Sequence, residues 1–424
     1  MSTPWMWLLI FRWKWVSSPI LIPPGLMIFL PRMMMTMSSE TLTVKHSTGK
    51  YPILVEPKSL DALGEQFERR SLKSPVGIVT NRRVNDLYGD RIREGLRGAG
   101  FVTRTVLMPD GERYKNLATV EQLINALLKQ KMERNGTILA LGGGVTGDVT
   151  GFVASILFRG VRWVQVPTTL LAQVDASVGG KTGVNHEFGK NIIGAFHQPE
   201  LVVIDPEVNL TLETRDRLSG YAEMLKMAFI LDPSFLDVLI KYRDKIIDGD
   251  DVNMLSRAIS RSVALKAQIV TEDERESNRR RVLNFGHTFA HALEKVTEYK
   301  RYRHGEAVLL GMYAAGWLSN QVSGLSNDNW EIMRSILRDV PFDQQVDDLD
   351  AAKVVAAMEG DKKTRHDRIN YVLLKRFGDV TITDAVSPTA AQLAVQAMKV
   401  AFSNSGNTDD ESTSDANVSA TGKL

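Results

Sequence analysis

Cysteine is absent from the 424 residues of this chain. A disulfide framework is therefore excluded, and nothing in the composition indicates an oxidising compartment. The same absence restricts any transition-metal site to histidine nitrogen and carboxylate oxygen ligands. Histidine is also scarce: the chain has seven, and three of them lie between residues 287 and 304. We therefore look for a metal site in that short stretch.

An excess of charge of either sign is missing as well. The 52 Lys and Arg residues nearly balance the 50 Asp and Glu residues, which leaves a formal net charge of +2. We therefore expect no general affinity for nucleic acid, although this balance is compatible with a local basic pocket. Apolar residues make up 43% and charged residues 24% of the chain, as in globular proteins, and the length suggests two or three domain-sized units.

The two ends differ from the rest of the chain. The first 39 residues hold four of the seven Trp and no acidic residue, but five Pro and Gly residues between 19 and 31 interrupt their apolar run. This argues against a membrane anchor, and a small-residue cleavage site for a signal peptide is lacking. We interpret residues 1–37 as an unstructured extension or a mis-assigned start, with the true start near Met33–Met37. Residues 403–424 are polar and are predicted to be a disordered tail.

Strand and helix patterns alternate in the first half. Strands are predicted at 76–80, 102–107 and 137–141, and helices at 82–98 and 117–131. This alternation indicates βαβ units and a parallel sheet, on which ligands bind beyond the carboxyl ends of the strands.

A glycine-rich turn, Gly142–Asp148, follows the third of these strands directly, and Gly142, Gly144 and Gly147 satisfy G-x-G-x-x-G. In a strand–turn–helix context such a turn can carry a pyrophosphate on free N–H groups, although glycine turns after strands are often structural. The next strand, 163–166, does not end in an acidic residue that could hold a ribose, so this is not the common dehydrogenase pattern.

A second glycine cluster, 175–185, contains Gly179-Gly180-Lys181. It fails the G-x-x-x-x-G-K-[ST] pattern, which rejects a Walker-type ATPase. Backbone N–H groups beside an ammonium still favour an anion, so we predict a phosphate-facing loop that is completed by 189–191.

Helical patterns dominate from about residue 212. Glu223 and Lys226 lie at i and i+3 in the apolar segment 220–231, which predicts a charged pair on a buried helix face. His287 and His291 lie at i and i+4, and His304 begins a further helix. Two histidines with one carboxylate predict a Zn²⁺ site, but the spacing leaves open which two histidines ligate. The sequence His-Glu-x-x-His is absent, which rejects a zincin protease.

A charged run lies nearby and contains Glu276, Arg279, Arg280 and Arg281. Such runs are usually solvated surface. Beside a metal and a phosphate loop, this one could instead receive an anionic substrate together with Lys266 and the later segment 361–363.

Taken together, these segments resemble the 3-dehydroquinate synthase family, the sugar-phosphate cyclases of the shikimate pathway. The matching stretches are GGGVTGDVTGF (142–152), RGVRWVQVPTTLLAQVDASVGGKTGVN (159–185), GKNIIGAFHQP (189–199), SGYAEMLKMAFI (219–230), RVLNFGHTFAHALE (281–294) and HGEAV (304–308). The resemblance implies an α/β, Rossmann-like NAD-binding domain over 38–211 and a mostly α-helical, metal- and substrate-binding domain over 212–402.

The resemblance also implies roles for individual residues. The implied ligands of Zn²⁺ or Co²⁺ are Glu223, His287 and His304. The implied NAD contacts are Asp110, Gly111, Glu112, Lys115, Gly144, Val145, Thr146, Gly147, Asp148, Thr168, Thr169, Lys181, Lys190 and Thr211. The implied catalytic and substrate-binding residues are Asp175, Lys181, Asn191, Lys226, Lys266, Arg280, Asn284 and His291, with Arg159 from a neighbouring subunit and either Lys362 or Lys363.

The implied reaction converts 3-deoxy-D-arabino-heptulosonate 7-phosphate to 3-dehydroquinate and phosphate, in a cytoplasmic homodimer without nucleic-acid or membrane partners. Related cyclases that make amino-dehydroquinate, inosose or valiolone, and metal-dependent polyol dehydrogenases, are alternatives; an inactive NAD-binding regulator is a further one. Arg280 and Lys266 suit a substrate carboxylate, which disfavours the inosose, valiolone and polyol alternatives but not the amino analogue.

Overall fold

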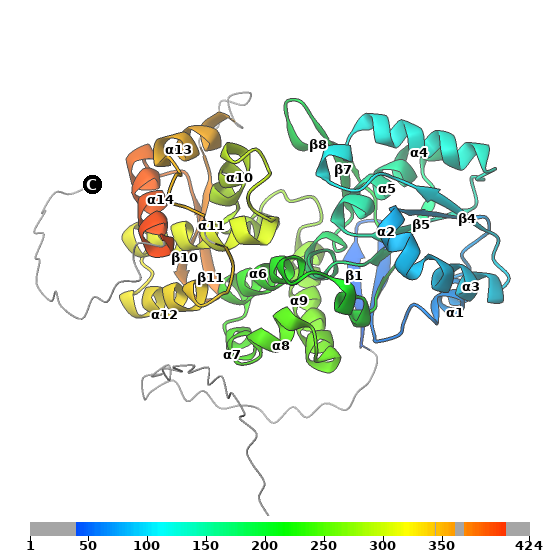
Figure 1. The fold of residues 1–424 in the computed structure, drawn as a ribbon, viewed down its shortest axis with the longest axis horizontal. Helices are drawn as coiled ribbons and strands as arrows, with labels where there is room; N and C mark the ends of the chain where they lie inside the picture. The colour runs from blue at the N-terminus through cyan, green and yellow to red at the C-terminus, as the bar shows by residue number, and fades with distance from the viewer. Residues whose placement is uncertain (1–39, 344, 361–368, 404–424) are drawn as a thin grey trace, which may run out of the picture. The chain divides into compact units, whose positions relative to one another are not determined.

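A seven-stranded sheet organises the first half of the chain (Figure 1). The computed structural model describes residues 40–343, 345–360 and 369–403, all within one compact unit. The strands, in sheet order, are β1 (Glu40–His46), β2 (Gly49–Val55), β9 (Leu201–Ile204), β6 (Arg162–Pro167), β5 (Thr137–Gly142), β3 (Val76–Thr80) and β4 (Thr103–Leu107). The pair β1–β2 is antiparallel and the remaining neighbours are parallel.

Helices cover both faces of this sheet. They are α1 (Leu63–Arg69), α2 (Arg82–Val84), α3 (Asp90–Gly98), α4 (Leu117–Lys129) and α5 (Gly144–Ile156). In β5, Ile138 and Ala140 pack into a cluster with α4 and α5, whereas Leu139 and Leu141 pack into a cluster with α1 and α3. This alternation follows from the two-residue period of a strand, and it explains why a strand buried on both faces has a continuous apolar sequence.

The predicted strands at 76–80, 102–107, 137–141 and 163–166 are confirmed as β3, β4, β5 and β6, within one residue at their ends. The predicted helices are also present, and the glycine turn leads from β5 into α5 as expected. The sequence reading missed β1, β2 and β9, which extend the sheet on its other side. The division into domains at residue 211 stays a prediction.

The predicted phosphate-facing loop is wrong in its conformation. Most of it forms an antiparallel hairpin of β7 (Lys181–His186) and β8 (Gly189–Phe196). Gly183 and Gly194 face each other across this hairpin, and a Cβ on Gly194 would lie only 2.1 Å from the carbonyl oxygen of Thr182. These two glycines therefore permit close pairing of the two strands. In the sequence, glycines with this role cannot be distinguished from the glycines of a phosphate-binding loop.

The second half is mostly helical, as predicted. Its helices are α6 (Thr214–Leu231), α7 (Ser234–Lys241), α8 (Arg243–Asp248), α9 (Val252–Glu272), α10 (His287–Val296), α11 (His304–Leu318), α12 (Asn327–Arg338), α13 (Ala351–Gly360) and α14 (Pro388–Phe402). Residues 217–230 of α6 are all buried, so this helix forms the centre of the helical part. The sequence reading missed one hairpin, β10 (Tyr371–Arg376) with β11 (Asp379–Thr383).

Several expectations fall outside the described residues: the extension 1–37, Lys362, Lys363, and all but the first residue of the tail 403–424. Among the helices that the structure does describe, none combines the length and apolar character needed to cross a membrane.

Candidate active site

Three helices each contribute one side chain to a group that could hold a metal ion. Glu223 lies in the middle of α6, and His287 and His304 are the first residues of α10 and α11. Nε2 of each imidazole lies 3.5 Å from Oε1 of Glu223, and the three candidate ligand atoms all lie within 4.8 Å of one another. Two imidazoles and one carboxylate at this spacing suit a divalent transition metal such as Zn²⁺.

Glycines let α10 and α11 approach closely enough to bring the two imidazoles together. A Cβ on Gly311 of α11 would lie 2.2 Å from the carbonyl oxygen of Gly286, the residue before α10. Gly286 has a left-handed φ of 79°, and a Cβ there would meet Cγ of Met312 at 2.8 Å. Any larger residue at either position would separate the two helices.

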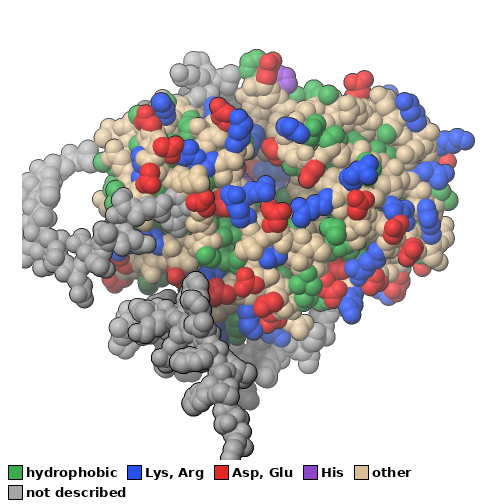
Figure 2. Space-filling model, viewed as in Figure 1, with side chains coloured by type: hydrophobic (Ala, Val, Ile, Leu, Met, Phe, Trp, Pro, Cys, Tyr) green, Lys and Arg blue, Asp and Glu red, His purple; other side chains and the backbone are tan. Residues whose placement is uncertain are grey.

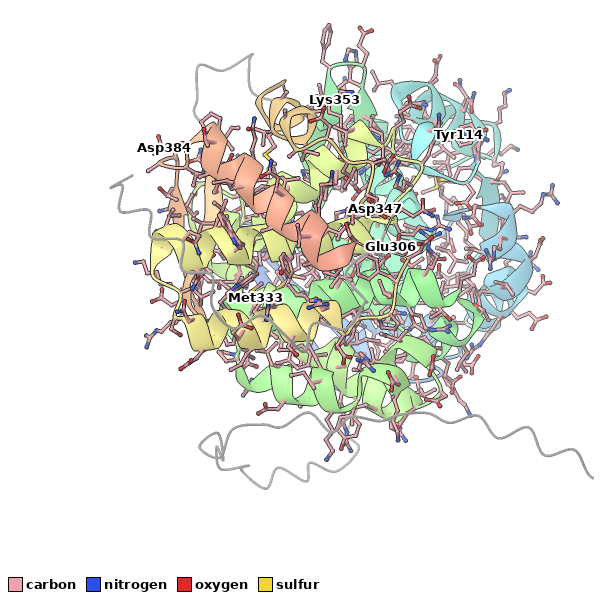
Figure 3. The ribbon with its side chains drawn as sticks, turned by 60° about the vertical axis from the view of Figure 1, so that its left-hand side comes forward. Tyr114, Glu306, Met333, Asp347, Lys353 and Asp384 are labelled. Carbon is pink, nitrogen blue, oxygen red and sulfur yellow. The ribbon has the colours of Figure 1, made fainter. Side chains whose placement is uncertain are left out.

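A buried carboxylate fixes the start of α11. Glu306, labelled in Figure 3, is fully buried near the beginning of that helix. Its Oε2 accepts a hydrogen bond of 2.8 Å from the main-chain N–H of Arg303, the residue before the helix, and the guanidinium of Arg215 donates to both oxygens at 2.7 Å. The helix therefore begins at His304, with the imidazole facing α6.

The carboxylate of Glu223 is fully buried and needs nearby positive charge. Lys226, one turn further along α6, is also buried and pairs with Oε2, which confirms the predicted buried Glu–Lys pair. Burial would raise the pKa of Glu223, but Lys226 and the two imidazoles together lower it well below its ordinary value. Within the described structure neither carboxylate oxygen accepts a hydrogen bond of normal geometry. A buried, charged carboxylate left in this state fits a metal ligand.

The two imidazoles of the group differ in protonation. Burial lowers the pKa of His287 to about 3, so this ring is neutral and its Nε2 can bind a cation. Burial also acts against the charged form of His304, but two neighbouring carboxylates outweigh it and raise the pKa of this ring to about 9. One of them is Glu294, whose Oε1 lies 3.1 Å from Nδ1 of His304. A bound metal would have to displace a proton from His304.

His291, the alternative ligand left open by the spacing, lies outside the close group. Its side chain is exposed, and its ring centroid lies 5.5 Å from that of His287 and 6.4 Å from that of His304. The i, i+4 spacing does place His291 above His287 on α10. The fold, however, brings α11 across the start of that helix, so His304 is the histidine that joins Glu223.

A cavity of about 480 Å³ opens beside the metal group. On the face drawn in Figure 2, Lys and Arg side chains surround a hollow. The predicted site residues that line the cavity are Asp148, Asp175, Lys181, Asn191, Lys226, Lys266, Arg280, Asn284 and His287. They come from α5, the helical turn Ala172–Ala176, the hairpin β7–β8, α6, α9, the segment before α10 and the first residue of α10, so residues far apart in the sequence meet at one cavity.

Charges in the cavity are arranged for an anion. Lys266 is buried and donates to Oδ1 of Asp175 at 2.8 Å. Arg280 is buried as well, and its Nε has no hydrogen-bond partner among the described residues. Burial, followed by the nearby Arg280 and Lys266, lowers the pKa of Lys181 to about 7. Three cations near one another, with an unpaired donor on one of them, favour a ligand with negative charge.

The turn assigned to NAD lies where parallel-sheet topology places ligands. Gly144 is the first residue of α5, so N–H groups of the first helical turn are free beyond the end of β5. Nζ of Lys115 pairs with Oδ2 of Asp148 at 2.6 Å and also donates to the side-chain oxygen of Asn191. The segment 110–115, the glycine turn and the hairpin therefore meet at one point.

The remaining residues assigned to NAD are more dispersed. Thr168 and Thr169 follow β6, and the N–H of Thr168 donates to Gly142 at 2.9 Å, beside the glycine turn. Glu112 accepts a hydrogen bond of 2.8 Å from the side chain of Asn185. Thr211 lies beyond β9, where its hydroxyl is 2.6 Å from that of Tyr88.

Of the described residues assigned to catalysis and substrate binding, Arg159 and His291 do not line the cavity. The side chain of Arg159 is exposed just after α5, where Phe158 and Arg159 both adopt left-handed φ values of 51° and 66°.

Two acidic residues gain contacts that the sequence did not indicate: Glu276 was predicted only as a member of the charged run, and Glu294 was given no role. Glu276 pairs with Lys181 and accepts a hydrogen bond of 2.9 Å from Asn284, so it lies between two residues assigned to the substrate. Glu294 contacts His304, as described above. Glu294 lies three residues after His291 on α10, and that spacing was the available signal for it.

Comparisons with known proteins match both halves of the chain. Residues 105–219 match the family model described as 3-dehydroquinate synthase N-terminal, and residues 220–364 match that described as 3-dehydroquinate synthase C-terminal. A 3-dehydroquinate synthase from Geotalea uraniireducens is 43% identical over 343 residues, which cover 81% of this chain and 95% of that protein.

Two solved structures share the fold. A 2-epi-5-epi-valiolone synthase from Streptomyces hygroscopicus, with NAD⁺ and Zn²⁺ bound, has a TM-score of 0.74 at 27% identity, covering 82% of this chain and 96% of its own. A 2-deoxy-scyllo-inosose synthase, complexed with carbaglucose-6-phosphate, NAD⁺ and Co²⁺, has a TM-score of 0.74 at 22% identity, covering 84% and 99%. The second likeness concerns the fold alone.

Proposed function

The chain belongs to the 3-dehydroquinate synthase family, and from this premise we propose that its cavity converts 3-deoxy-D-arabino-heptulosonate 7-phosphate to 3-dehydroquinate and phosphate. The observation that carries the proposal is the position of the buried cations. Lys266 and Arg280 line the same cavity as His287, so an anionic substrate can contact the cations and the metal group together.

Glu223, His287 and His304 would hold Zn²⁺ or Co²⁺, and the turn 144–148 with Lys115, Thr168, Thr169 and Lys190 would hold NAD. When bound, NAD would supply a transient oxidation at C5 of the substrate, and the metal would polarise the C4 and C5 hydroxyls. The valiolone synthase with NAD⁺ and Zn²⁺ bound supports both assignments, and the buried Glu223 carboxylate supports the metal.

The chain's own residues would hold the two ends of the substrate. Arg280 and Lys266 would pair with its carboxylate, because both are buried cations and Arg280 keeps a free donor. The phosphate would be held by Lys181, Asn191, Asn284 and His291. Oxidation at C5 makes the adjacent proton acidic, so elimination needs little beyond a firm grip on the phosphate and a nearby acceptor for that proton.

The competing cyclases act on different sugar phosphates. Valiolone and inosose cyclases and polyol dehydrogenases take substrates without a carboxylate, and the Nε donor of the buried Arg280 would then stay unpaired. Identity is also higher to 3-dehydroquinate synthases than to the valiolone synthase. The amino analogue of the substrate carries the same carboxylate, so an assay must separate it.

The deciding experiment measures phosphate release from the heptulosonate phosphate with substoichiometric NAD⁺ and added Zn²⁺. We expect many turnovers for each NAD⁺ and no net NADH, because the reaction is redox-neutral. The amino analogue and a hexose phosphate without a carboxylate serve as comparison substrates. Stoichiometric NADH would favour a polyol dehydrogenase, and preference for another sugar phosphate would move the chain to a related cyclase.

We further propose that the enzyme works as a homodimer in the cytoplasm. An exposed Arg159 that lies outside the lining of its own cavity supports a role in a neighbouring subunit.

A further inference from the structure

One buried carboxylate, Glu294 of α10, contacts residues from two separate parts of the site. Its side chain is 6% exposed. Oε1 lies 3.1 Å from Nδ1 of the candidate metal ligand His304, and Oε2 lies 3.4 Å from Nζ of Lys190, near the tip of the hairpin β7–β8. No role has been assigned to Glu294 so far, yet it connects a metal ligand with a residue assigned to NAD.

The contact with His304 decides which imidazole nitrogen carries a proton. An ionised carboxylate can only accept a hydrogen bond, so Nδ1 of His304 must donate. Nε2, which lies 3.5 Å from Glu223, is then the nitrogen that a metal can bind once it displaces the second proton of the ring. A carboxylate that holds a ligating histidine in this way fixes both the tautomer and the orientation of the ring.

Lys190 makes a second contact in addition to the one with Glu294. Nζ of Lys190 lies 4.0 Å from the ring centroid of Tyr299, so the ammonium contacts an aromatic face as well as a carboxylate. The backbone turns sharply to place this ring: Glu298 and Tyr299 have left-handed φ values of 54° and 56°, and the N–H of Tyr299 donates to the carbonyl of Glu294 at 2.7 Å. Left-handed backbone at two successive non-glycine residues is uncommon and often accompanies a functional constraint.

The neighbouring hairpin residue extends the connection to the other half. Asn191 accepts a hydrogen bond from Lys115, which pairs with Asp148 of the glycine turn. Residues 190 and 191 therefore connect α10 with the turn assigned to NAD.

We propose that Glu294 is a positioning residue that orients His304 for the metal and, through Lys190, couples the metal group to the hairpin β7–β8. The inference rests on the proposed function for the identity of the metal ligands. If NAD binding moves Lys190 away from Glu294, NAD will change the affinity of the protein for the metal. The metal must then change the affinity for NAD by the same factor.

The test measures Zn²⁺ affinity of the purified full chain by competition with a chromogenic chelator. Glu294→Ala should bind Zn²⁺ roughly 10- to 100-fold more weakly. Glu294→Gln should fall between wild type and Ala, because its amide oxygen still accepts from Nδ1–H but carries no charge. The visible spectrum of the Co²⁺-loaded protein should change in the same order. Glu331→Gln, an exposed carboxylate paired with Arg334 on α12, should behave as wild type.

The coupling is tested with Lys190→Met. In the wild type we expect the Kd of NAD to differ with and without Zn²⁺. In Lys190→Met the ratio of these two Kd values should move towards one. Wild-type Zn²⁺ affinity and an unchanged Co²⁺ spectrum in a folded Glu294→Ala would overturn the inference. If Ala does not fold, the same result in the isosteric Gln variant overturns it. A wild-type chain that binds Zn²⁺ but releases no phosphate from any sugar phosphate would instead count against the proposed function.

Discussion

At the scale of single residues, the site depends on cations that are not fully neutralised. Lys181 is half exposed, pairs with Glu276 and has a pKa lowered to about 7 by burial and by Arg280 and Lys266. A substrate phosphate would replace Glu276 as the partner of Lys181 and would also favour its charged form. Removal of the Lys181 charge should therefore weaken the contact with the substrate phosphate.

Lys181→Ala should lower kcat/KM, because the phosphate loses a charge-assisted contact. Such contacts contribute about 1.5–3 kcal/mol, which corresponds to roughly a 10- to 150-fold loss. NAD affinity should change much less if the dinucleotide lies on the turn 144–148. Steady-state kinetics and NAD titration on one preparation measure both, with the exposed Lys300→Ala as the control. A large NAD defect with normal substrate kinetics would place Lys181 in the cofactor site.

The metal ligands are tested by the metal content of three variants. His287→Ala and His304→Ala should each lose bound Zn²⁺ after dialysis, because each removes one of three ligand atoms that lie within 4.8 Å of one another. His291→Ala should retain the metal and lose substrate turnover. Elemental analysis and the assay of phosphate release give the two readouts. Zn²⁺ loss from His291→Ala would show that the ligand assignment is wrong.

The pH dependence of metal binding follows from His304. Glu223 and Glu294 raise its pKa to about 9 against the effect of burial, so the ring is protonated at neutral pH when no metal is bound. The metal competes with this proton, and affinity should therefore rise with pH up to about 9. Between pH 6 and pH 8 we expect a gain of up to about 100-fold and the release of about one proton for each Zn²⁺ bound. Chelator competition and titration in weak buffer measure these two quantities, and a flat profile would contradict the protonated state of His304.

The chemistry of these residues could be predicted from the sequence better than their pairing. With no cysteine and seven histidines, the sequence narrows the ligands to three histidines near 287–304. Spacing alone could not choose between His291 and His304, because it shows which residues are neighbours on one helix and not where two helices cross; only the family resemblance implied His304. The partners of Glu276 and Glu294 could not be predicted for the same reason, because each contact joins side chains from different structural elements.

At the scale of elements, β3 and β5 were predictable from their continuous apolar sequence, because both faces of the sheet are covered. The strand β9 is equally apolar and buried but has only four residues, and it was missed. The hairpins β7–β8 and β10–β11 were not predicted. In each of them the two strands pair only with one another, as a two-stranded sheet separate from the seven-stranded one. In β7–β8 the glycines serve strand pairing at Gly183 and Gly194, while Lys181 and Asn191 of the same hairpin line the cavity. Two side chains of this segment therefore line the cavity, although the segment is a hairpin and not the predicted loop.

The crossing of α10 and α11 yields a prediction at this scale. Gly311→Ala would place a Cβ 2.2 Å from the carbonyl oxygen of Gly286, so the helices must separate. We expect a loss of about 1–3 kcal/mol in the free energy of unfolding together with weaker Zn²⁺ binding, because His287 and His304 move apart. Gly98→Ala is the matched control: it is also helical, but its Cβ would meet nothing within 4 Å, and it should be neutral or stabilising by up to about 1 kcal/mol. Denaturant unfolding of both variants decides the point.

At the scale of the whole molecule, the cavity of one chain is lined by five charged residues assigned to the substrate, Asp175, Lys181, Lys226, Lys266 and Arg280, but not by Arg159. The side chain of Arg159 is exposed, and it follows α5 in a turn where Phe158 and Arg159 both have left-handed φ values. A second copy of the chain is the partner that the family resemblance implies.

Mixing two inactive variants tests whether Arg159 acts in the neighbouring subunit. Arg159→Ala lacks that arginine but keeps its metal ligands, and His304→Ala keeps the arginine but lacks one ligand. If subunits exchange freely, half of the dimers in an equal mixture contain one chain of each kind. In these the Arg159→Ala chain has a complete metal group and receives Arg159 from its partner, so one site in two is intact. Activity should therefore recover to about a quarter of the wild-type value per site. Arg159 acting within its own chain predicts no recovery, as does a monomer, and sedimentation of the mixture distinguishes these two results.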